Sequence, residues 1–203
     1  MPELTYESAL AGVAVPSGLA VSLREIPERG MIDLRGLASS RKFMAAAKAA
    51  LGTDLPRQPR SSQSWGDVKI LWLAPDQWLI LCPRTKADAM LAELRGALAG
   101  THSLAVGVSD MRAIIRIEGE GSREILMKGT SLDLLSSDYP AGTVRRMGFA
   151  GIAALLHVVE DDIFDIYVFR SYAHYAWDFL LATAREEAKI RLFGKQSSSI
   201  LRS

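Results

Sequence analysis

The feature that most constrains this chain is an internal repeat, which predicts a molecule built from two similar halves. Residues 155–184, LLHVVEDDIFDIYVFRSYAHYAWDFLLATA, follow the plan of residues 69–98 at an offset of 86. Both segments read as an apolar strand, an acidic turn, a second apolar strand and a helix. Asp76 then corresponds to Asp162 and Arg84 to Arg170. The match is one of pattern more than of identity, and it covers turn, cap and core positions together.

Residues 68–83 predict an antiparallel hairpin. Apolar side chains alternate along VKILWL and along WLILC, and Pro75-Asp76 between them favours a tight turn. Both faces of the second strand are apolar, which indicates a central strand covered on two sides. A helix is expected next, with Thr85 as its N-cap (Ser171 in the second copy) and Gly100 as its stop. Its apolar stripe at helical spacing comprises Ala87, Met90, Leu91, Leu94 and Leu98.

The segments before the two hairpins also repeat, at an offset of 83. MIDLRGLASSRKFMAAAKAAL predicts a strand to Gly36 and a helix capped by Ser39, and AIIRIEGEGSREILMKGTSLDL predicts a strand to Gly119 and a helix capped by Ser122. We therefore expect an α+β fold of two tandem β-α-β-β-α repeats, residues 24–100 and 107–187, joined in one pseudo-twofold body over 24–187. Residues 1–23 are expected to form a lead-in and residues 188–203 a polar tail.

The hydrophobic content, the net charge and the number of cysteines argue against several classes of protein. The 203 residues are 49% hydrophobic, enough for a large core, and 24 basic against 23 acidic side chains leave a net charge of +1. That balance provides no global field for nucleic acid or an anionic membrane. Cys82 is the only cysteine, which excludes an intrachain disulfide and disfavours a cysteine-based zinc site. The N-terminus does not resemble a signal peptide, and no apolar run reaches the roughly 20 residues of a membrane helix, so we expect a cytoplasmic protein.

No motif in the sequence indicates catalysis, a metal site or a cofactor site. GEGSRE, residues 119–124, has two glycines of a dinucleotide fingerprint, but Glu124 stands where the third is needed, so we interpret it as a strand–helix turn. His102, His157 and His174 lack metal-ligand spacing, and His157 is expected in the core or at a sheet edge. Cys82 lies in an apolar run and is interpreted as an inert thiol.

Two charged clusters remain as candidates. VSDMR contains Asp110 and Arg112, and FRSYAHY contains Arg170, Ser171 and Tyr172. An ion-pair or capping role is favoured over a ligand role for both, and we name Arg112, Arg170 and Tyr172 as interface candidates. Loop arginines form a further basic group: Arg57, Arg60, Arg145 and Arg146. Solvated arginines are the favoured interpretation of this group, with an RNA-binding module as the weakest of the functional alternatives. The sequence leaves the burial of Trp65 and Trp72 open.

Three segments in series carry a family likeness. ILWLAPDQWLIL, VSDMRAIIRIEGEGSREILMKGTSLDL and FDIYVFRSYAHYAWDFLL together resemble the gamma subunit of heterotetrameric sarcosine oxidase, over about residues 25–185. That family is similar to the folate-binding domain of the glycine-cleavage aminomethyltransferase, itself a two-copy α+β fold. The resemblance is separate from the repeat and agrees with it.

The resemblance implies a subunit with no catalytic, cofactor-binding or metal-binding residues of its own. The complex would oxidatively demethylate sarcosine to glycine and pass the one-carbon unit to tetrahydrofolate. FAD, FMN, NAD, tetrahydrofolate and zinc would lie on the alpha, beta and delta subunits, and this chain would pack mainly against alpha. The folate-side aspartate of aminomethyltransferases has no recognisable counterpart here. The alternative from another class is a stand-alone folate-binding one-carbon transferase or a folate-dependent accessory protein.

Overall fold

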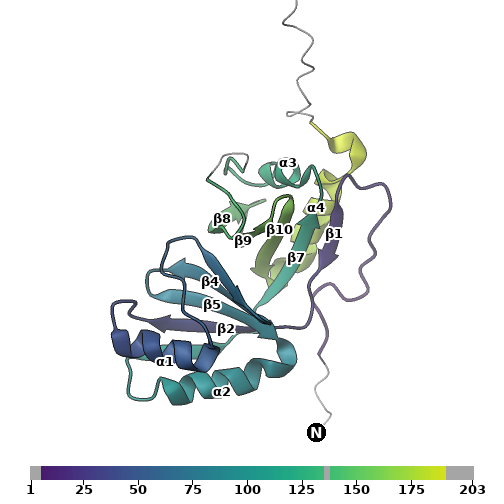
Figure 1. Ribbon diagram of the computed structural model, residues 1–203. Coiled ribbons are helices and arrows are strands. Elements are labelled where there is room, and N and C mark those ends of the chain that lie inside the picture. The colour runs from purple at the N-terminus through teal and green to yellow at the C-terminus, as the bar shows by residue number, and fades with distance from the viewer. Residues whose placement is uncertain (1–5, 135–137, 191–203) are drawn as a thin grey trace, which may run out of the picture.

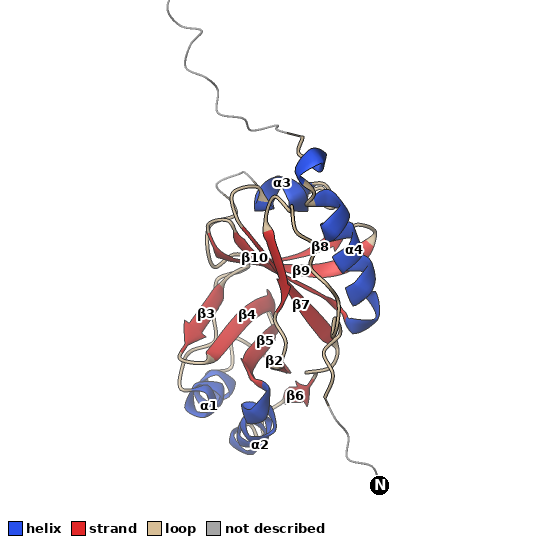
Figure 2. Ribbon diagram, turned by 90° about the vertical axis from the view of Figure 1, so that its right-hand side faces the viewer, coloured by secondary structure: helices blue, strands red, loops and turns tan. Residues whose placement is uncertain are grey.

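The computed structural model describes residues 6–134 and 138–190. Two five-stranded sheets, antiparallel throughout, lie face to face, and helices cover the outer face of each (Figures 1 and 2). The layers therefore run helix, sheet, sheet, helix. The expected α+β class with two related halves is confirmed. Residues 1–5 of the predicted lead-in and 191–203 of the predicted tail lie outside the described residues.

Each half supplies five strands and two α-helices. The first half contains β1 (Ser22–Glu25), β2 (Arg29–Gly36), α1 (Arg41–Leu51), β3 (Ser62–Trp65), β4 (Val68–Ala74), β5 (Gln77–Pro83), the 3-10 turn η1 (Arg84–Lys86) and α2 (Ala87–Ala97). The second half contains β6 (Ser103–Gly107), β7 (Arg112–Glu118), α3 (Ser122–Met127), β8 (Val144–Phe149), β9 (Ile152–Glu160), β10 (Ile163–Phe169), η2 (Arg170–Tyr172), α4 (Ala173–Thr183) and η3 (Glu186–Ala188).

The hairpin repeat is confirmed element by element. β5 and β10, η1 and η2, and α2 and α4 each begin and end at positions 86 apart. β4 pairs with β5, and β9 pairs with β10, across the two acidic turns. The second strand of each hairpin is central, since β5 lies between β4 and β2 and β10 lies between β9 and β7. The structure adds two strands to each predicted repeat: β1 and β3 in the first, β6 and β8 in the second.

The first strands of the two halves are exchanged between the sheets. One sheet has the order β3-β4-β5-β2-β6 and the other β8-β9-β10-β7-β1. Thus β6, from the second half, pairs with β2 of the first, and β1, from the first half, pairs with β7 of the second. Strand β1 straddles residue 23, where the lead-in was expected to end, and it fixes Leu23 opposite Ile117.

The helix starts differ from the predicted caps. Ser40, not Ser39, caps α1, with its hydroxyl accepting the N–H of Phe43 at 3.2 Å. Thr85 and Ser171 do not cap helices, because a 3-10 turn precedes each helix and no side-chain cap bond forms. Ser122 is the first residue of α3, and its hydroxyl donates to the carbonyls of Gly119 and Asp162 rather than accepting from the helix. These four cap predictions, Ser39, Thr85, Ser171 and Ser122, are wrong.

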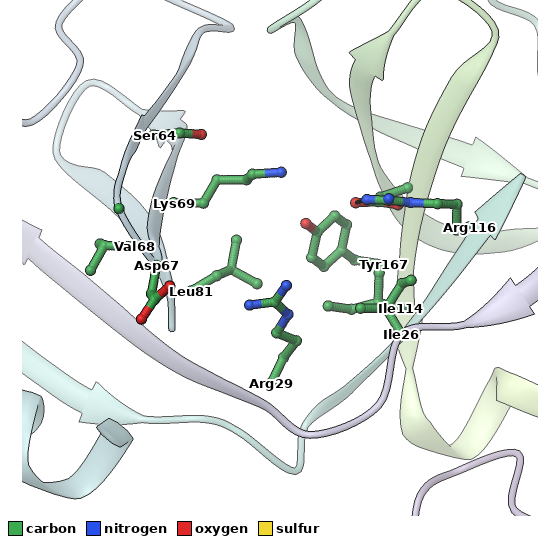
Figure 3. A pocket seen from close by; sticks show the side chains of 12 residues that line it. Ile26, Arg29, Ser64, Asp67, Val68, Lys69, Leu81, Ile114, Arg116 and Tyr167 are labelled. Carbon is green, nitrogen blue, oxygen red and sulfur yellow. Dashed lines mark hydrogen bonds and ion pairs between the residues drawn. The ribbon is translucent and has the colours of Figure 1, made fainter. Parts of the chain in front are cut away.

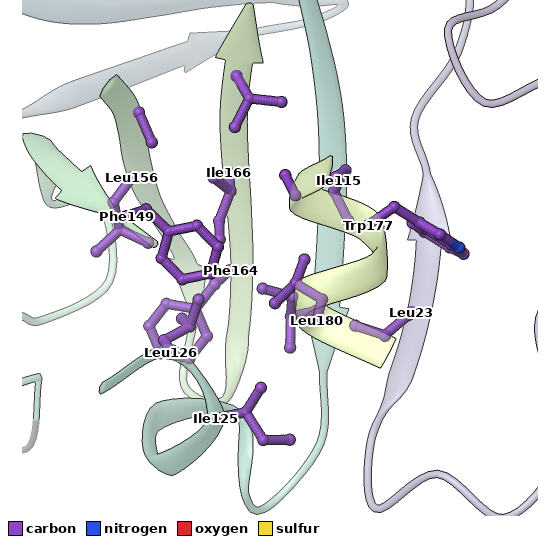
Figure 4. Packing of buried hydrophobic residues seen from close by; sticks show 14 of the residues in the cluster. Leu23, Ile115, Ile125, Leu126, Phe149, Leu156, Phe164, Ile166, Trp177 and Leu180 are labelled. Carbon is purple, nitrogen blue, oxygen red and sulfur yellow. The ribbon is translucent and has the colours of Figure 1, made fainter. Parts of the chain in front are cut away.

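Three hydrophobic layers hold the molecule together. One lies between the first sheet and helices α1 and α2, and contains the predicted inward residues Phe43, Ala47, Leu51 and Leu94. Another lies between the second sheet and helices α3 and α4, where Ile125, Leu126, Trp177 and Leu180 pack on the strands (Figure 4). The third lies between the two sheets: Met31, Leu71, Leu79, Leu81, Ile114, Val144, Leu155 and Tyr167. The central strands β5 and β10 are therefore apolar on both faces near their middle.

Candidate functional site

A cavity of about 200 Å³ lies between the two sheets, beside the apolar layer that joins them. The end of β3 and the start of β4 form one wall, and β7 and β10 form the other (Figure 3). Arg29, at the start of β2, points into the cavity from a third side. Both halves of the chain therefore contribute to one cavity, which opens to solvent where Arg29, Ser64 and Asp67 are exposed.

The far wall carries an ion pair. Arg116 on β7 stands opposite Asp165 on β10 in the strand register. Arg116 Nε donates to Oδ1 of Asp165 at 2.7 Å and Nη2 donates to Oδ2 at 2.9 Å. The Asp165 side chain is 5% exposed and that of Arg116 is 20% exposed. Two parallel bonds hold this carboxylate in a fixed geometry, so both of its oxygens are already engaged.

Lys69 enters the cavity from the opposite wall and is half-buried. Within the described parts of the chain, no carboxylate lies within 4.0 Å of its ammonium group or of the Arg29 guanidinium. Burial lowers the pKa of Lys69, and the charge of Asp165 partly offsets that effect. The cavity thus contains two cations without an ion-pair partner, one of them partly desolvated.

Tyr167 lines the cavity, with its hydroxyl directed toward the side from which Lys69 enters (Figure 3). Burial raises the pKa of Tyr167 well above its ordinary value of 10.0, and the nearby Asp165 charge raises it further. The phenol is therefore protonated at neutral pH and can act as a hydrogen-bond donor. Ser64 adds a second hydroxyl at the rim.

His157 is buried beside this region, on β9. The Ser62 hydroxyl donates to the Gly142 carbonyl at 3.0 Å, so its oxygen must accept the bond from His157 Nε2 at 3.1 Å. This assigns the proton to Nε2 and leaves Nδ1 as a buried acceptor, which has no partner among the described residues. Burial lowers the pKa of His157 to about 4, and the charge of Lys69 contributes. Of the two positions that the sequence allows for His157, the core and a sheet edge, the structure shows the core, and the bond to Ser62 joins the two halves.

The structure brings two of the three predicted interface residues together. Arg112 and Arg170 line one small cavity with Glu25 and the N-terminal segment. Arg112 is half-buried, with its guanidinium 4.6 Å from the centre of the Phe169 ring. Arg170 Nη2 donates to the Glu7 carbonyl at 2.6 Å. Tyr172 lies apart from that cavity and is 47% exposed. Nothing in these contacts tests the assignment to an interface, which stays a prediction.

The structure also shows the surroundings of the other residues that the sequence singles out. Asp110 pairs with Arg84, the first-half counterpart of Arg170, at 2.8 Å. Cys82 is fully buried, and burial raises the pKa of its thiol, as expected of an inert residue. Trp65 is 62% exposed, whereas Trp72 is partly buried against the helices. The two arginine loops meet where Val144 N donates to the Arg60 carbonyl at 2.8 Å.

A larger hollow of about 580 Å³ lies on the surface beside the start of α2. Its charged lining is Arg84, Asp88 and Asp110, and the Arg84 charge is taken up by Asp110. Over residues 6–134 and 138–190, no three His, Cys, Asp or Glu side chains gather as a metal site would require. Over the same residues, every helix is too short or too polar to cross a bilayer.

The residues lining the inter-sheet cavity were missed from the sequence, although a signal for them exists. Lys69 interrupts VKILWL, Arg116 interrupts AIIRIE and Asp165 interrupts IFDIYVF, each on a strand whose other residues are mostly apolar. A buried charge is expensive unless paired. Charges on central strands are therefore candidates for the same polar cluster.

Comparison with known proteins gives consistent matches. The model of the sarcosine oxidase, gamma subunit family matches residues 35–186. The sarcosine oxidase subunit gamma of Corynebacterium sp. (strain P-1) is 29% identical over 137 residues, which span 67% of this chain and 66% of that protein. The chain thus spans about two thirds of the length of that curated relative.

Two solved structures share the fold. A chain of the heterotetrameric sarcosine oxidase from Corynebacterium sp. U-96, in complex with pyrrole 2-carboxylate, superposes with a TM-score of 0.81 at 24% identity, covering 91% of this chain and 97% of that one. The glycine cleavage system aminomethyltransferase T from Bartonella henselae superposes with a TM-score of 0.58 at 17% identity, covering 80% and 46%. The predicted likeness to the aminomethyltransferase fold is confirmed at the level of architecture.

Proposed function

Because this chain belongs to the sarcosine oxidase gamma subunit family, we propose that it is a non-catalytic subunit of a heterotetrameric sarcosine oxidase. The family match over residues 35–186 carries the proposal. The complex demethylates sarcosine oxidatively to glycine and passes the one-carbon unit to tetrahydrofolate. It works in the cytoplasm, in keeping with a chain that has a single cysteine, which is buried.

The chemistry of the described side chains supports a role without catalysis. A general base or nucleophile must have a free lone pair within reach of a substrate and a pKa suited to its task. Both oxygens of Asp165 are bound by Arg116, Tyr167 is held protonated, and His157 is buried with its Nε2 on Ser62. Asp165, Tyr167 and His157 are therefore poorly placed to move a proton.

The partners of this subunit are the alpha, beta and delta subunits, and it packs most directly on alpha. FAD, FMN, NAD, tetrahydrofolate and zinc belong to those subunits. Large apolar side chains that remain exposed on this chain support a role in protein contacts. Those most exposed are Trp65, Leu37, Ile190, Leu104, Val15 and Tyr175.

Co-expression tests the proposal. The full chain is produced alone and together with the alpha, beta and delta subunits, and the products are compared by size-exclusion chromatography and by flavin absorbance. We expect this chain in stoichiometric amount in a flavin-containing complex, and no flavin absorbance when it is produced alone. A chain that is monodisperse alone and never co-purifies with alpha contradicts the proposal.

The predicted interface residue that is most accessible is Tyr172, and it gives a sharper version of the same test. Tyrosines that act as interface hot spots contribute about 2 kcal/mol or more, so Tyr172→Ala should weaken association with alpha by about thirtyfold or more. Arg57→Ala, at an exposed position outside the predicted interface, should change association less than about twofold. Equal affinities for the two variants would remove Tyr172 from the interface.

The aminomethyltransferase fold supports one rival, a stand-alone folate-dependent transferase. The inter-sheet cavity, at about 200 Å³, is smaller than the roughly 300–1,000 Å³ of sites that enclose a drug-sized ligand. In the larger hollow beside α2 the charges of Arg84 and Asp110 offset each other, and Asp88 leaves a net negative charge that repels the carboxylates of a folate. Calorimetry with tetrahydrofolate decides: one-to-one binding of micromolar affinity by this chain alone would favour the rival.

A further inference from the structure

The walls of the inter-sheet cavity present hydrogen-bond donors and positive charge from three directions. Lys69 extends from β4, Arg29 from the start of β2, and the Tyr167 hydroxyl from β10 (Figure 3). We propose that this cavity is a binding site for a small oxyanion, a carboxylate or phosphate group of a compound with few other atoms. All of the residues that line it belong to this chain.

The lining of the cavity contains more cations than carboxylates. Its lining includes three cations, Arg29, Lys69 and Arg116, and two carboxylates, Asp67 and Asp165. Asp165 is bound by Arg116, and Asp67 accepts a bond of 2.8 Å from Lys86, which lies outside the lining. Within the described residues, Arg29 and Lys69 are therefore the lining cations without a carboxylate within 4.0 Å.

Such an arrangement favours an anion over a cation or a neutral ligand. An oxyanion between Lys69 and Arg29 would gain charge-assisted bonds, which are about twice as strong as neutral ones. Its negative charge would also offset the desolvation that lowers the pKa of Lys69, as the charge of Asp165 partly does. The Tyr167 and Ser64 hydroxyls supply neutral donors to the same space, whereas the carboxylate of Asp165 is turned toward Arg116.

The size of the cavity restricts the ligand. A volume of about 200 Å³ is below the range of pockets that enclose drug-sized molecules. It accommodates inorganic phosphate or a short mono- or dicarboxylate. The apolar side chains at its base, Ile26, Leu81 and Ile114, leave room for a short hydrocarbon part next to the charged group.

The test uses the full chain at low ionic strength, titrated with sodium phosphate, sodium acetate and sodium succinate, with sodium chloride as the reference. Calorimetry and amide chemical shifts follow binding to the wild-type chain and to Lys69→Met, Arg29→Met and Lys48→Met. Lys48→Met is the matched control, because it removes the same charge from α1, where Lys48 pairs with exposed Asp54.

We expect saturable one-to-one binding of at least one of these anions, with shift changes in β4, β7 and β10. Because a hydrogen bond to a charged group contributes at least about 1.4 kcal/mol, Lys69→Met and Arg29→Met should each weaken binding about tenfold. Lys48→Met should bind within about twofold of wild type, and added salt should weaken binding in every variant that retains it.

Lack of saturable binding for all three anions, or equal affinity of Lys69→Met, Arg29→Met and wild type, overturns the proposal. Arg29 is exposed, so its replacement keeps the test valid if Lys69→Met fails to fold. Subunit association is measured separately by co-purification. A chain that joins the complex but binds no anion would therefore contradict this inference and leave the proposed function standing.

Discussion

Arg116 and Asp165 form a two-point ion pair across neighbouring strands, with bonds of 2.7 and 2.9 Å between the guanidinium and the carboxylate. Removing one partner would leave a charge with little access to water. Asp165→Leu should therefore lower the free energy of unfolding by about 3 kcal/mol, measured by urea denaturation.

A double variant separates the cost of an unpaired buried charge from the stabilising effect of the ion pair itself. Adding Arg116→Met to Asp165→Leu removes the uncompensated charge, and an apolar pair can replace a buried ion pair with little loss. The double variant should recover most of the stability lost in the single one. Further loss in the double variant would show that the ion pair stabilises the fold more than it costs to bury.

The buried His157 should make stability depend on pH. Its pKa is about 4 in the folded chain, against 6.5 for an ordinary histidine. The unfolded chain then binds more protons between those values, so stability falls as the pH drops from about 6.5 to about 4. The full effect is about 3 kcal/mol, since each pKa unit corresponds to about 1.36 kcal/mol.

Comparison of two histidine variants isolates this effect from carboxylate titration. His157→Gln keeps a donor for Ser62, and it should reduce the loss of unfolding free energy between about pH 7 and pH 4 by about 3 kcal/mol. His174→Gln, at an exposed position on α4, should follow the wild-type curve. Parallel pH curves for His157→Gln and wild type would contradict the assignment of a neutral buried imidazole.

Gly36 is the last residue of β2, and close packing leaves no room for a side chain at this position. A Cβ atom at this position would overlap the Phe43 ring, which is fully buried and packs against Trp78 at 5.7 Å between ring centroids. Gly36→Ala should destabilise the chain by about 1–3 kcal/mol, the usual range for overpacking.

The chain offers an internal control for that change. Gly96 lies in α2, and a Cβ atom added there would meet no heavy atom within 4 Å beyond its own helix backbone and chain neighbours. Gly96→Ala should stabilise the chain by about 0.5–1 kcal/mol, because alanine loses less backbone entropy in a helix. Melting curves should therefore move in opposite directions for the two substitutions.

Because β1 pairs with β7 of the other half, a substitution in β1 should affect a strand that is distant in the sequence. Leu23, on β1, is 3% exposed and packs in the layer of the second sheet. Leu23→Ala should cost about 2–4 kcal/mol and reduce hydrogen-exchange protection of β7, about 90 residues further along the chain. Arg24→Ala, at the neighbouring outward position, should cost less than about 0.5 kcal/mol, since its pair with Glu118 is exposed. Reduced protection confined to β2 and β5 would contradict the observed pairing.

Much of the architecture follows from alternation and helical spacing. The apolar residues of β5 and β10 predict central strands, and those of α2 predict its buried face, because burial on two faces or on one stripe has a distinct period. The helix caps were wrong where two polar residues compete: Ser39 and Ser40 are equally suited, and only the path of the chain selects Ser40.

The polar strands and the cavity could not be predicted in the same way. β3, with the sequence SQSW, has no apolar alternation, and it is defined by its pairing with β4. Pairing of β1 with β7 and of β6 with β2 depends on contacts between distant segments, which local pattern does not encode. The meeting of Lys69 with Arg116 and Tyr167 depends on how the two sheets are placed, and that is a property of the whole chain.

The reciprocal placement of β1 and β6 has a consequence for any attempt to divide the molecule. One repeat produced by itself would carry its own first strand with no sheet to join, and would present an unpaired edge along β2 or β7. An open edge of that kind recruits another strand. The simplest way for a lone repeat to satisfy it is to pair with a second copy of itself, so each half is expected to be stable only as a domain-swapped dimer.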